Sequence, residues 1–363
     1  MSVINEASKI ETTNSTSHPT YSRYLEAISS GKTPRARELA KQLDISEGEL
    51  VACRQGIETW AIKPPFQNLL AQLENLGEVM TITRNDEAVH ETTGTYHKFS
   101  FMEKGNMGLV LSDDIDLRLF LGQWHSAFNV IEHDRHSIQF FNAHGLAVHK
   151  IYRTDNTLTS KWDALIAEFR DPSPVIPTYL TPEEDPASEL PVDFDQASFA
   201  QQWSELKDVH EYHGMLKKHG LSRTQALSQI GALWATKLDQ DSVKNAITLA
   251  EAANCNIMVF VGNKGCIQIF SGEVHRLMQQ GPWFNVLDPG FNLHLREDLI
   301  AETWAIKRPS SDGIITSIEA FNAKGDSILT LFGKRKPGNP ELSLWQNIVE
   351  KTINLSAKQE ITP

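Results

Sequence analysis

A histidine stands in an apolar setting within DQASFAQQWSELKDVHEYHGMLKKHG (residues 195–220). At 100° per residue of a helix, Phe199, Trp203 and Leu206 form an apolar stripe, and His210 lies at its centre. An imidazole among large apolar side chains must be hydrogen-bonded, or else it coordinates a metal. One interpretation is therefore a core histidine bonded to a backbone carbonyl. The other is an axial ligand to iron, because an apolar wall suits a porphyrin face.

Three cations stand in or next to predicted strands. Arg118 and Phe120 share one strand face of the apolar run DLRLFLGQW (116–124), where an arginine is either exposed at a sheet edge or paired with an anion. Lys307 lies in TWAIKRPSSDG, and Arg335 lies in LFGKRKPGNPE. Each of these two is either a solvated charge at a strand end or part of an anion site. The metalloprotease spacing H-E-x-x-H, the Walker A sequence and G-x-S-x-G do not occur.

The composition excludes several classes of protein. The 363 residues carry a net charge of −12, and an acidic balance disfavours nonspecific nucleic-acid binding. No run approaches the roughly 18 apolar residues of a membrane span, and the first 20 residues lack the pattern of a signal peptide. The three cysteines form no C-x-x-C, which favours a reducing compartment. We therefore expect a soluble cytoplasmic protein of about two domains, without membrane insertion and without a nucleic-acid partner.

The two halves of the chain resemble each other. IQFFNAHGLAVHKIY (138–152) aligns with IEAFNAKGDSILTLF (318–332), and both contain Phe-Asn-Ala-x-Gly. Upstream, three pairs of identical residues recur 178 positions apart: Met80 with Met258, Asn85 with Asn263, and Gly94 with Gly272. Between these blocks, DLRL (116–119) aligns with NLHL (292–295) and places Arg118 opposite His294. Several matches in the same order predict an internal duplication.

A proline-rich acidic segment lies near the middle of the chain. Residues 171–195 hold six of the 16 prolines, which predicts an extended connector. We expect five regions, in this order: a disordered tail (1–20), an N-terminal repeat (21–170), the connector (171–195), a C-terminal repeat that carries His210 (196–345), and a C-terminal helix or tail (346–363).

Helical patterns precede strand patterns in each half. The second half predicts helices at about 196–218, 222–238 and 241–253. Strand runs joined by short turns, as at Asn142–Gly145 and Asn322–Gly325, predict antiparallel sheets with the helices to one side. The expected fold class is α+β, a tandem duplication in which each half has a helical segment and a large antiparallel sheet.

One segment favours a different class of function. TPRARELAKQLDISEGELVACRQG (33–56) resembles the helix-turn-helix of DNA-binding regulators. Its second helix carries Glu47 and Glu49, with Arg54 as the single cation, and acidic side chains facing phosphates are unfavourable. A transcription regulator is therefore a distant alternative.

Long blocks of the chain resemble the HemS/HmuS family of bacterial cytoplasmic haem-handling proteins, which are labelled hemin transport or hemin-degrading factors. The resemblance spans about Tyr21 to Glu341, and four blocks carry it: DLRLFLGQW (116–124), LKDVHEYHGMLKKHGLSRTQAL (206–227), GPWFNVLDPGFNLHLRED (281–298) and SDGIITSIEAFNAKGDSILTLFGKRKPGNPE (311–341). It implies haem b as cargo or substrate. The haem would lie in a cleft between the halves, formed largely by the C-terminal half.

The resemblance also implies a role for each candidate residue. His210, in Asp-Val-His, would be the axial ligand of the haem iron, and Arg118 would lie on the distal face as the candidate catalytic residue. His213 is an alternate ligand, because Tyr212 and His213 stand where family members often have two phenylalanines. The other implied haem-binding positions are Phe120, Arg223, Lys307 and Arg335, and Arg308 could take the role of Lys307.

Two functions follow from the resemblance. The protein is either a carrier that receives imported haem and passes it on, or an enzyme that opens the porphyrin ring and releases iron with an external electron donor. In the enzyme, Arg118 would polarise the distal ligand. The expected partners are an inner-membrane haem importer and a downstream haem oxygenase or reductase. The sequence leaves monomer and homodimer open.

Overall fold

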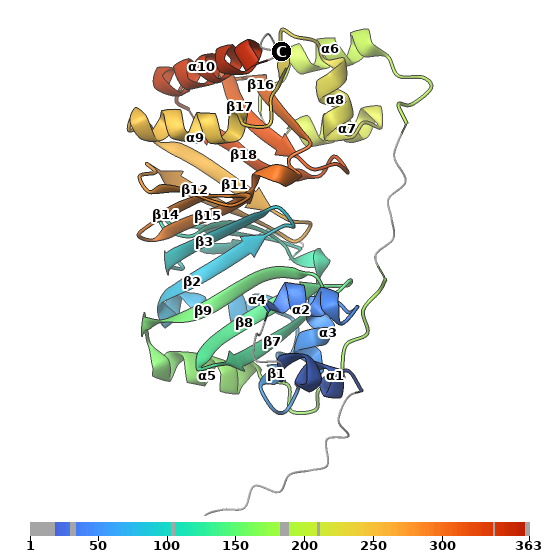
Figure 1. The fold of residues 1–363 in the computed structure, drawn as a ribbon, viewed down its shortest axis with the longest axis vertical. Coiled ribbons are helices and arrows are strands. Elements are labelled where there is room, and N and C mark those ends of the chain that lie inside the picture. The colour runs from blue at the N-terminus through green and yellow to red at the C-terminus, as the bar shows by residue number, and fades with distance from the viewer. Residues whose placement is uncertain are drawn as a thin grey trace, which may run out of the picture.

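The computed structural model describes residues 19–29, 34–102, 106–181, 189–208, 211–336 and 338–359. These residues form an α+β protein with two nine-stranded antiparallel sheets, as the sequence predicts (Figure 1). The helices of the N-terminal half are α1 (Pro19–Ile28), α2 (Ala36–Gln42), α3 (Glu47–Ala52), α4 (Gln67–Leu70) and α5 (Thr159–Phe169). Those of the C-terminal half are α6 (Gln196–Ser204), α7 (Glu211–His219), α8 (Arg223–Gln229), α9 (Ser242–Ala252) and α10 (Ser343–Gln359).

Each sheet combines strands from both halves of the chain. The first sheet has the order β1 (Thr59–Ala61), β7 (Trp124–Glu132), β8 (Arg135–Asn142), β9 (Ala147–Thr157), β2 (Gly77–Arg84), β3 (Ala88–Thr95), β15 (Phe291–Arg296), β14 (Trp283–Asp288) and β13 (Leu277–Gln280). The second has the order β10 (Ala235–Leu238), β16 (Glu302–Ser310), β17 (Gly313–Phe321), β18 (Ser327–Gly333), β11 (Ile257–Gly262), β12 (Cys266–Gly272), β6 (Asp116–Phe120), β5 (Met107–Leu111) and β4 (Phe99–Phe101). Each half thus gives three strands to the sheet of the other, which the repeat alone does not reveal.

The duplication predicted from the sequence recurs in the hydrogen bonds between the halves. The Asn85 side-chain amide donates to the carbonyl oxygens of Gly262 and Ile328, at 3.1 and 2.8 Å. Its repeat partner Asn263 donates to the carbonyl oxygens of Arg84 and Val148, at 3.0 and 2.9 Å; these two residues align with Gly262 and Ile328. The β2–β3 turn and the β11–β12 turn therefore join the two halves by equivalent hydrogen bonds.

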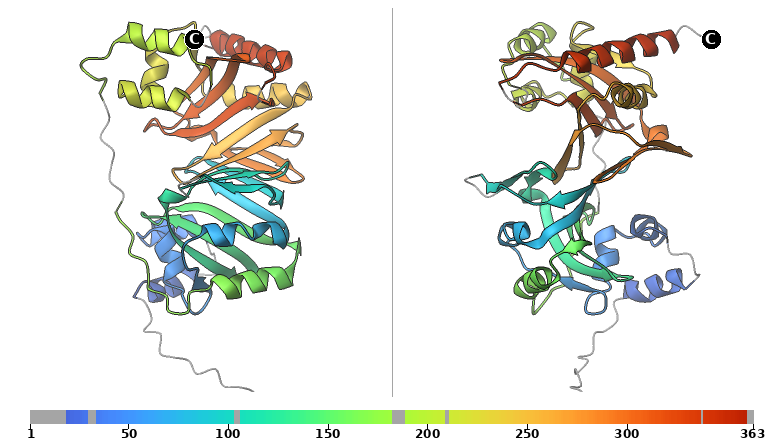
Figure 2. Two further views of the ribbon diagram at one scale, coloured as in Figure 1. Left: turned by 180° about the vertical axis from the view of Figure 1, so that it is seen from behind. Right: turned by 90° about the vertical axis from the view of Figure 1, so that its left-hand side faces the viewer.

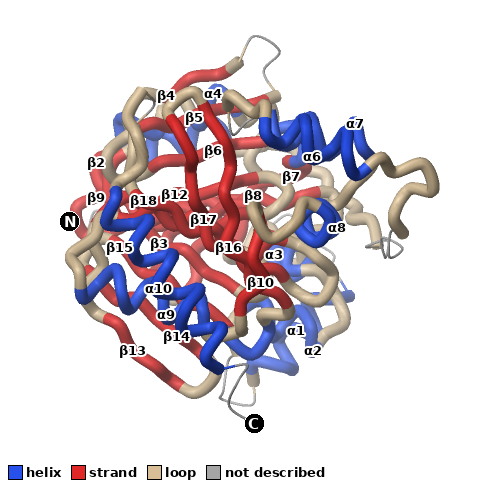
Figure 3. Tube along the Cα trace, turned by 90° about the horizontal axis from the view of Figure 1, so that it is seen from above, coloured by secondary structure: helices blue, strands red, loops and turns tan. Residues whose placement is uncertain are grey.

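Helices pack on part of both faces of each sheet. In the second sheet, α9 and α10 pack on the face that contains Val259 and Leu331, and α6 to α8 pack on the opposite face around Ile306 (Figures 1 and 2). Viewed from above, α9 and α10 lie side by side and pack against each other (Figure 3). In the first sheet, α5 packs on one face, and Val51 of α3 packs on the other.

The sheets meet in the middle of the molecule, where β2 contacts β11 and β12. A buried polar cluster lies at this junction: the His149 ring is 2.9 Å from both the Thr83 and Tyr96 hydroxyls, and Cys266 of the other half is 3.4 Å from Thr83. Burial lowers the pKa of His149 to about 3, so the ring is neutral. All three cysteines of the chain are free and buried.

The helix predicted over 196–218 is wrong in one respect, because α6 ends at Ser204 and α7 begins at Glu211. The carbonyl oxygen of Lys207 accepts from the backbone N–H of Ser311, in the β16–β17 turn, at 2.9 Å. The Glu211 carboxylate accepts from the backbone N–H of Lys207 at 3.0 Å. These contacts replace the helical hydrogen bonds of a continuous helix, so the apolar stripe does not extend helically from Trp203 to residue 210.

The helix predicted over 222–238 is too long, because α8 ends at Gln229 and β10 occupies Ala235–Leu238. Pairing of β10 with β16 overrides the local helical pattern. The second helix of the helix-turn-helix pattern is α3, and its Leu50, Val51 and Ala52 are 1–2 % exposed. A helix packed so deeply cannot enter a DNA groove.

Of the predicted tail and connector, the structure describes residues 19–20, which begin α1, and residues 171–181 and 189–195. Residues 1–18 lie outside the described residues, and α1 begins at Pro19. The segment 171–181 contains no helix or strand and docks on the N-terminal half, where the backbone N–H of Leu180 donates to the carbonyl of Ala143.

Candidate functional site

One face of the second sheet is partly uncovered. Helices α6 to α8 pack on it only over β10, β16 and β17, because the buried residues of that helical cluster contact Ala235, Trp304, Ile306 and Phe321. The next strands continue the same face with half-buried side chains, since alternate residues of paired strands share a face. We call this set the C-terminal floor: Met258, Phe260, Ile267, Phe332, Arg118 and Phe120.

The apolar part of the C-terminal floor contains a pair of aromatic side chains. Phe260 and Phe332 pack edge to face, with ring centroids 5.3 Å apart. Met258 lies directly opposite Phe332 in the β11–β18 register. Apolar side chains left half-exposed on a sheet favour an apolar ligand, because covering them removes hydrophobic surface from water.

Arg118 reaches this floor from the N-terminal half. Its strand, β6, pairs with β12 of the C-terminal half, and Arg118 lies opposite Ile267. Its guanidinium pairs with Asp116 on the same strand face. Burial raises the pKa of Asp116, although Arg118 opposes the shift. Because the Arg118 side chain is still 27 % exposed, a cation stands at one end of the apolar floor and is accessible to a ligand.

A buried carboxylate holds two arginines at the other end. Glu319 of β17 is fully buried and accepts from Arg223 at 2.6 Å and from Arg308 at 2.8 Å. Burial by itself would raise the pKa of Glu319, but the two guanidinium groups lower it to about 2. Arg308 also lies over the ring of Tyr212, 4.4 Å from its centroid.

Not every hydrogen-bond donor of this cluster has a partner. The Nε atoms of Arg223 and Arg308 are buried without a hydrogen-bond partner. The Arg223 side chain is 37 % exposed, whereas Arg308 is 4 % exposed. One carboxylate serves two guanidinium groups, so the cluster retains a positive charge beside the floor. Arg223 is the member that a ligand carboxylate can reach.

The structure does not bring all the predicted cations together. Arg335 follows β18 and lies 3.3 Å from Asp312 in the β16–β17 turn, next to the backbone of Lys207. Lys307 is exposed on the α10 side of the sheet, near Val349 and Ile353. Adjacent strand residues face opposite ways, so Arg308, and not Lys307, shares the face of Arg223.

Of the two predicted ligand histidines, His213 lies within the described residues. His210 lies outside the described residues. His213 lies on α7 and is exposed, while its neighbour Tyr212 is 6 % exposed and packs with Trp203. Tyr212 therefore fills the core position and presents its ring to Arg308.

The corresponding face of the first sheet carries different chemistry. Residues there align at the repeat offsets with residues on the sheet face that holds the C-terminal floor, and we call them the N-terminal floor: Met80, Ile82, Arg84, Glu91, Lys150, Tyr152 and His294. Arg84 stands where Gly262 stands in the other half, and His294 stands where Arg118 stands. The Nδ1 atom of His294 is 2.7 Å from the side-chain oxygen of Asn285.

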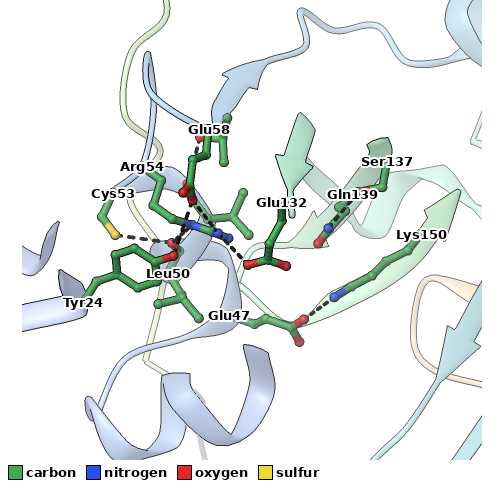
Figure 4. A network of polar contacts seen from close by, with 12 residues as sticks. Tyr24, Glu47, Leu50, Cys53, Arg54, Glu58, Glu132, Ser137, Gln139 and Lys150 are labelled. Carbon is green, nitrogen blue, oxygen red and sulfur yellow. Dashed lines mark hydrogen bonds and ion pairs between the residues drawn. The ribbon is translucent and has the colours of Figure 1, made fainter. Parts of the chain in front are cut away.

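The helix–strand ion pairs of the two halves are reversed, because the acidic residue lies on the helix in the N-terminal half and on the strand in the C-terminal half. In the N-terminal half, Glu47 on α3 pairs with Lys150 on β9, and Gln139 donates to Ser137 at 3.0 Å (Figure 4). In the C-terminal half, Arg223 stands at the start of α8 and Glu319 replaces Gln139. Ser46 and Ser222, which form matching capping boxes, fix this alignment of α3 with α8.

Sequence reasoning missed the floor residues Met258, Phe260, Ile267 and Phe332, and also the role of Glu319. The signal in NIMVFVG was an apolar run without alternation, which indicates a strand with both faces covered. Glu319 gave a weaker signal, as the one acidic residue in the apolar strand that precedes Phe-Asn-Ala.

The comparisons with known proteins agree with this arrangement. Residues 44–169 and 220–352 each match the family described as "Haemin-degrading HemS.ChuX domain". The chain belongs to this family. Within it, the "Hemin transport protein HmuS" of Yersinia pestis is 39% identical over 340 residues, which cover 92% of this chain and 97% of that protein.

Two solved structures of HemS-type proteins share the whole fold. Apo-PhuS, described as a heme-binding protein from Pseudomonas aeruginosa, is 42% identical with a TM-score of 0.88, over 91% of this chain and 97% of PhuS. ChuS, described as an E. coli heme oxygenase, is 36% identical with a TM-score of 0.81, over 92% of this chain and 99% of ChuS. The duplicated HemS arrangement therefore spans almost the whole chain.

The remaining observations concern membrane-spanning helices and a cavity that lies away from the C-terminal floor. No helix of the described ranges is long and apolar enough to span a membrane. A cavity of about 470 Å³ lies elsewhere, at the β1 edge of the first sheet, between Trp60, Arg170 and Pro172. None of the predicted site residues lines this cavity, so its chemistry is separate from that of the C-terminal floor.

Proposed function

We propose that this protein binds haem on the C-terminal floor and hands it on within the cytoplasm as part of iron acquisition from haem. The observation that carries the proposal is an uncovered apolar sheet face with accessible arginines at its ends. Haem is a flat apolar ring with two carboxylates, so it matches Phe260 and Phe332 in shape and Arg223 in charge. The names of the relatives HmuS and PhuS support the same ligand.

Each predicted residue takes a place in this proposal. His210 is the axial ligand of the haem iron, with the exposed His213 of α7 as the alternate ligand. Arg118 and Phe120 lie on the distal side, Arg223 binds the propionates, and Arg335, which pairs with Asp312, lies at the rim of the site. Arg308 takes the position first assigned to Lys307, because it shares the face of Arg223 and Lys307 faces α10.

A spectroscopic titration with hemin tests the proposal. Wild-type protein should give a saturable Soret shift at one hemin per chain, and His210→Ala should weaken binding by about tenfold or more with a changed Soret maximum. His213→Ala, three residues further along the chain, is the matched control and should leave the spectrum nearly unchanged. Equal effects of the two substitutions would refute the assignment of His210, and an unsaturable wild-type titration would refute the site.

Ring opening is a second candidate function, which the position of Arg118 on the C-terminal floor and the description of ChuS as a heme oxygenase support. Haem complex incubated aerobically with an enzymatic electron donor and catalase should lose its Soret band to a defined tetrapyrrole if the protein is an enzyme. An intact ring, with transfer of haem to a separate haem oxygenase, would leave the carrier function alone.

The proposed partners follow from the carrier function. An inner-membrane haem importer would supply haem, and a haem oxygenase or a reductase would receive it or act on it. Sedimentation of the haem-free and haem-loaded protein would decide between a monomer and a homodimer.

A further inference from the structure

The N-terminal floor lacks the features that suit haem. Glu91, Lys150 and Arg84 stand where the C-terminal half has the apolar or small residues Ile269, Thr330 and Gly262, and His294 replaces Arg118. The capping-box alignment of Ser46 with Ser222 places Pro34 opposite His210, and proline has no side-chain atom that can bind a metal. This face is nevertheless half-buried and uncovered in the same way. It therefore offers a site for a ligand of other chemistry.

Two guanidinium groups converge at the β2–β3 turn beside α2. Arg37 Nη1 of α2 and Arg84 Nε of β2 both donate to the carbonyl oxygen of Asn85, each at 3.2 Å. Two positive groups bound to one oxygen lie within a few ångströms of each other. Like charges at such a distance repel, and an anion placed between them would relieve the repulsion.

The nearby carboxylates do not neutralise Arg84. Glu47 is bound by Lys150, and Asp86 is bound by Arg37 on the exposed side of the turn. Glu87 accepts from the Asn322 side chain at 3.2 Å. Among the residues that the structure describes, Arg84 forms no ion pair, so its two Nη groups are free to bind an oxyanion. Burial, followed by the charge of Arg37, lowers the pKa of Arg84 to about 10, although the charges of Glu47 and Glu38 oppose the shift.

We propose that Arg84 and Arg37 form an oxyanion site on the N-terminal floor that binds the phosphoryl group of a small hydrophilic molecule. The fork of an arginine matches the geometry of phosphate oxygens in a bidentate contact. A small ligand is favoured over a nucleic acid because Arg84 is half-buried on the sheet, beneath α2, where a duplex backbone cannot follow. The site is independent of the proposed binding of haem, since it lies on the other sheet.

Isothermal calorimetry with pyrophosphate at low ionic strength tests the proposal. Wild-type protein should bind one pyrophosphate per chain, and Arg84→Gln should weaken binding by about tenfold or more, as for loss of a charge-assisted bidentate contact. Arg84→Lys, which keeps the charge without the fork, should fall between the two. The matched control is Arg153→Gln on β9, whose guanidinium faces Thr159 and should not affect binding.

The remaining arms separate the alternatives. Citrate binding more weakly than pyrophosphate would support a phosphoryl ligand, and citrate binding more tightly would overturn it in favour of a carboxylate. A DNA duplex that binds more tightly than pyrophosphate, with the same dependence on Arg84, would overturn the small-molecule assignment. Absence of binding by any of these anions, or equal binding by wild type and Arg84→Gln, would refute the site. The hemin titration of Arg84→Gln should match wild type, so this proposal can fail without the haem proposal failing.

Discussion

The two halves of this protein place different chemistry on the same frame. Both floors lie on the uncovered part of a nine-stranded sheet, beside a short helix that begins with a capping box. One floor carries Phe260 and Phe332, and the other carries Ile82 and Tyr152 at the equivalent positions, with Lys150 where the C-terminal half has Thr330. The comparison teaches that the fold supplies a surface and two flanking helices, while the side chains of a few alternating positions select the ligand.

The largest expected difference between the halves concerns the buried acid. Glu319→Ala should lower the free energy of unfolding by about 3–5 kcal/mol, because it leaves two guanidinium groups without their carboxylate. Gln139→Ala, at the equivalent position, should cost about 1 kcal/mol for one lost hydrogen bond. Urea denaturation measures both, and equal losses would show that the Glu319 cluster does not differ energetically from its counterpart.

The pH dependence of stability should follow the same residue. The folded pKa of Glu319 is about 2, below its usual value of 4.5, so its stabilisation is present above pH 4.5 and is lost as the pH falls toward 2. The loss from this group should approach about 3 kcal/mol. Glu319→Gln should flatten the profile in that window, whereas Gln139→Glu should not reproduce it. A profile unchanged by Glu319→Gln would contradict the assigned shift.

Asn85 and Asn263 should contribute equally to stability, because they occupy equivalent positions in the two halves. Each side-chain amide donates to two carbonyl oxygens of the other half. Asn85→Ala and Asn263→Ala should each lower the free energy of unfolding by about 2–3 kcal/mol, because buried carbonyl groups lose their donors. Thermal denaturation of both variants measures this, and a large inequality would mean that the two joints are not equivalent.

The smallest expected effect concerns the floor itself. Phe260→Ala should weaken hemin binding by about tenfold, as expected for about 1.5 kcal/mol of lost apolar contact. Tyr152→Ala, on the N-terminal floor, should leave hemin affinity unchanged. Fluorescence quenching by hemin measures both affinities. If the two substitutions weakened hemin binding equally, haem would not bind specifically on the C-terminal floor. If only Tyr152→Ala weakened it, haem would bind on the N-terminal floor instead.

Sequence patterns were sufficient for the fold class and the duplication. Asn85 and Asn263 align because both turns need the same cross-half hydrogen bonds, and Phe-Asn-Ala-x-Gly marks equivalent hairpins. Helical periodicity failed between Ser204 and Glu211, because a hydrogen bond from the distant Ser311 ends the helix there. Local propensity contains no information about such a contact.

The sequence by itself determined which residue types are present and which positions are equivalent in the two halves. The sequence pattern predicted a strand at Arg118 and a helix that begins near Arg223. The four long blocks that resemble the HemS/HmuS family indicated a haem-handling protein. Only the tertiary structure decided which of these residues share a face. The exchange of three strands between the halves carries Arg118 into the sheet of Phe260, and strand alternation directs Lys307 away from Arg223. Both outcomes depend on pairing between residues far apart in the chain, which no local pattern encodes.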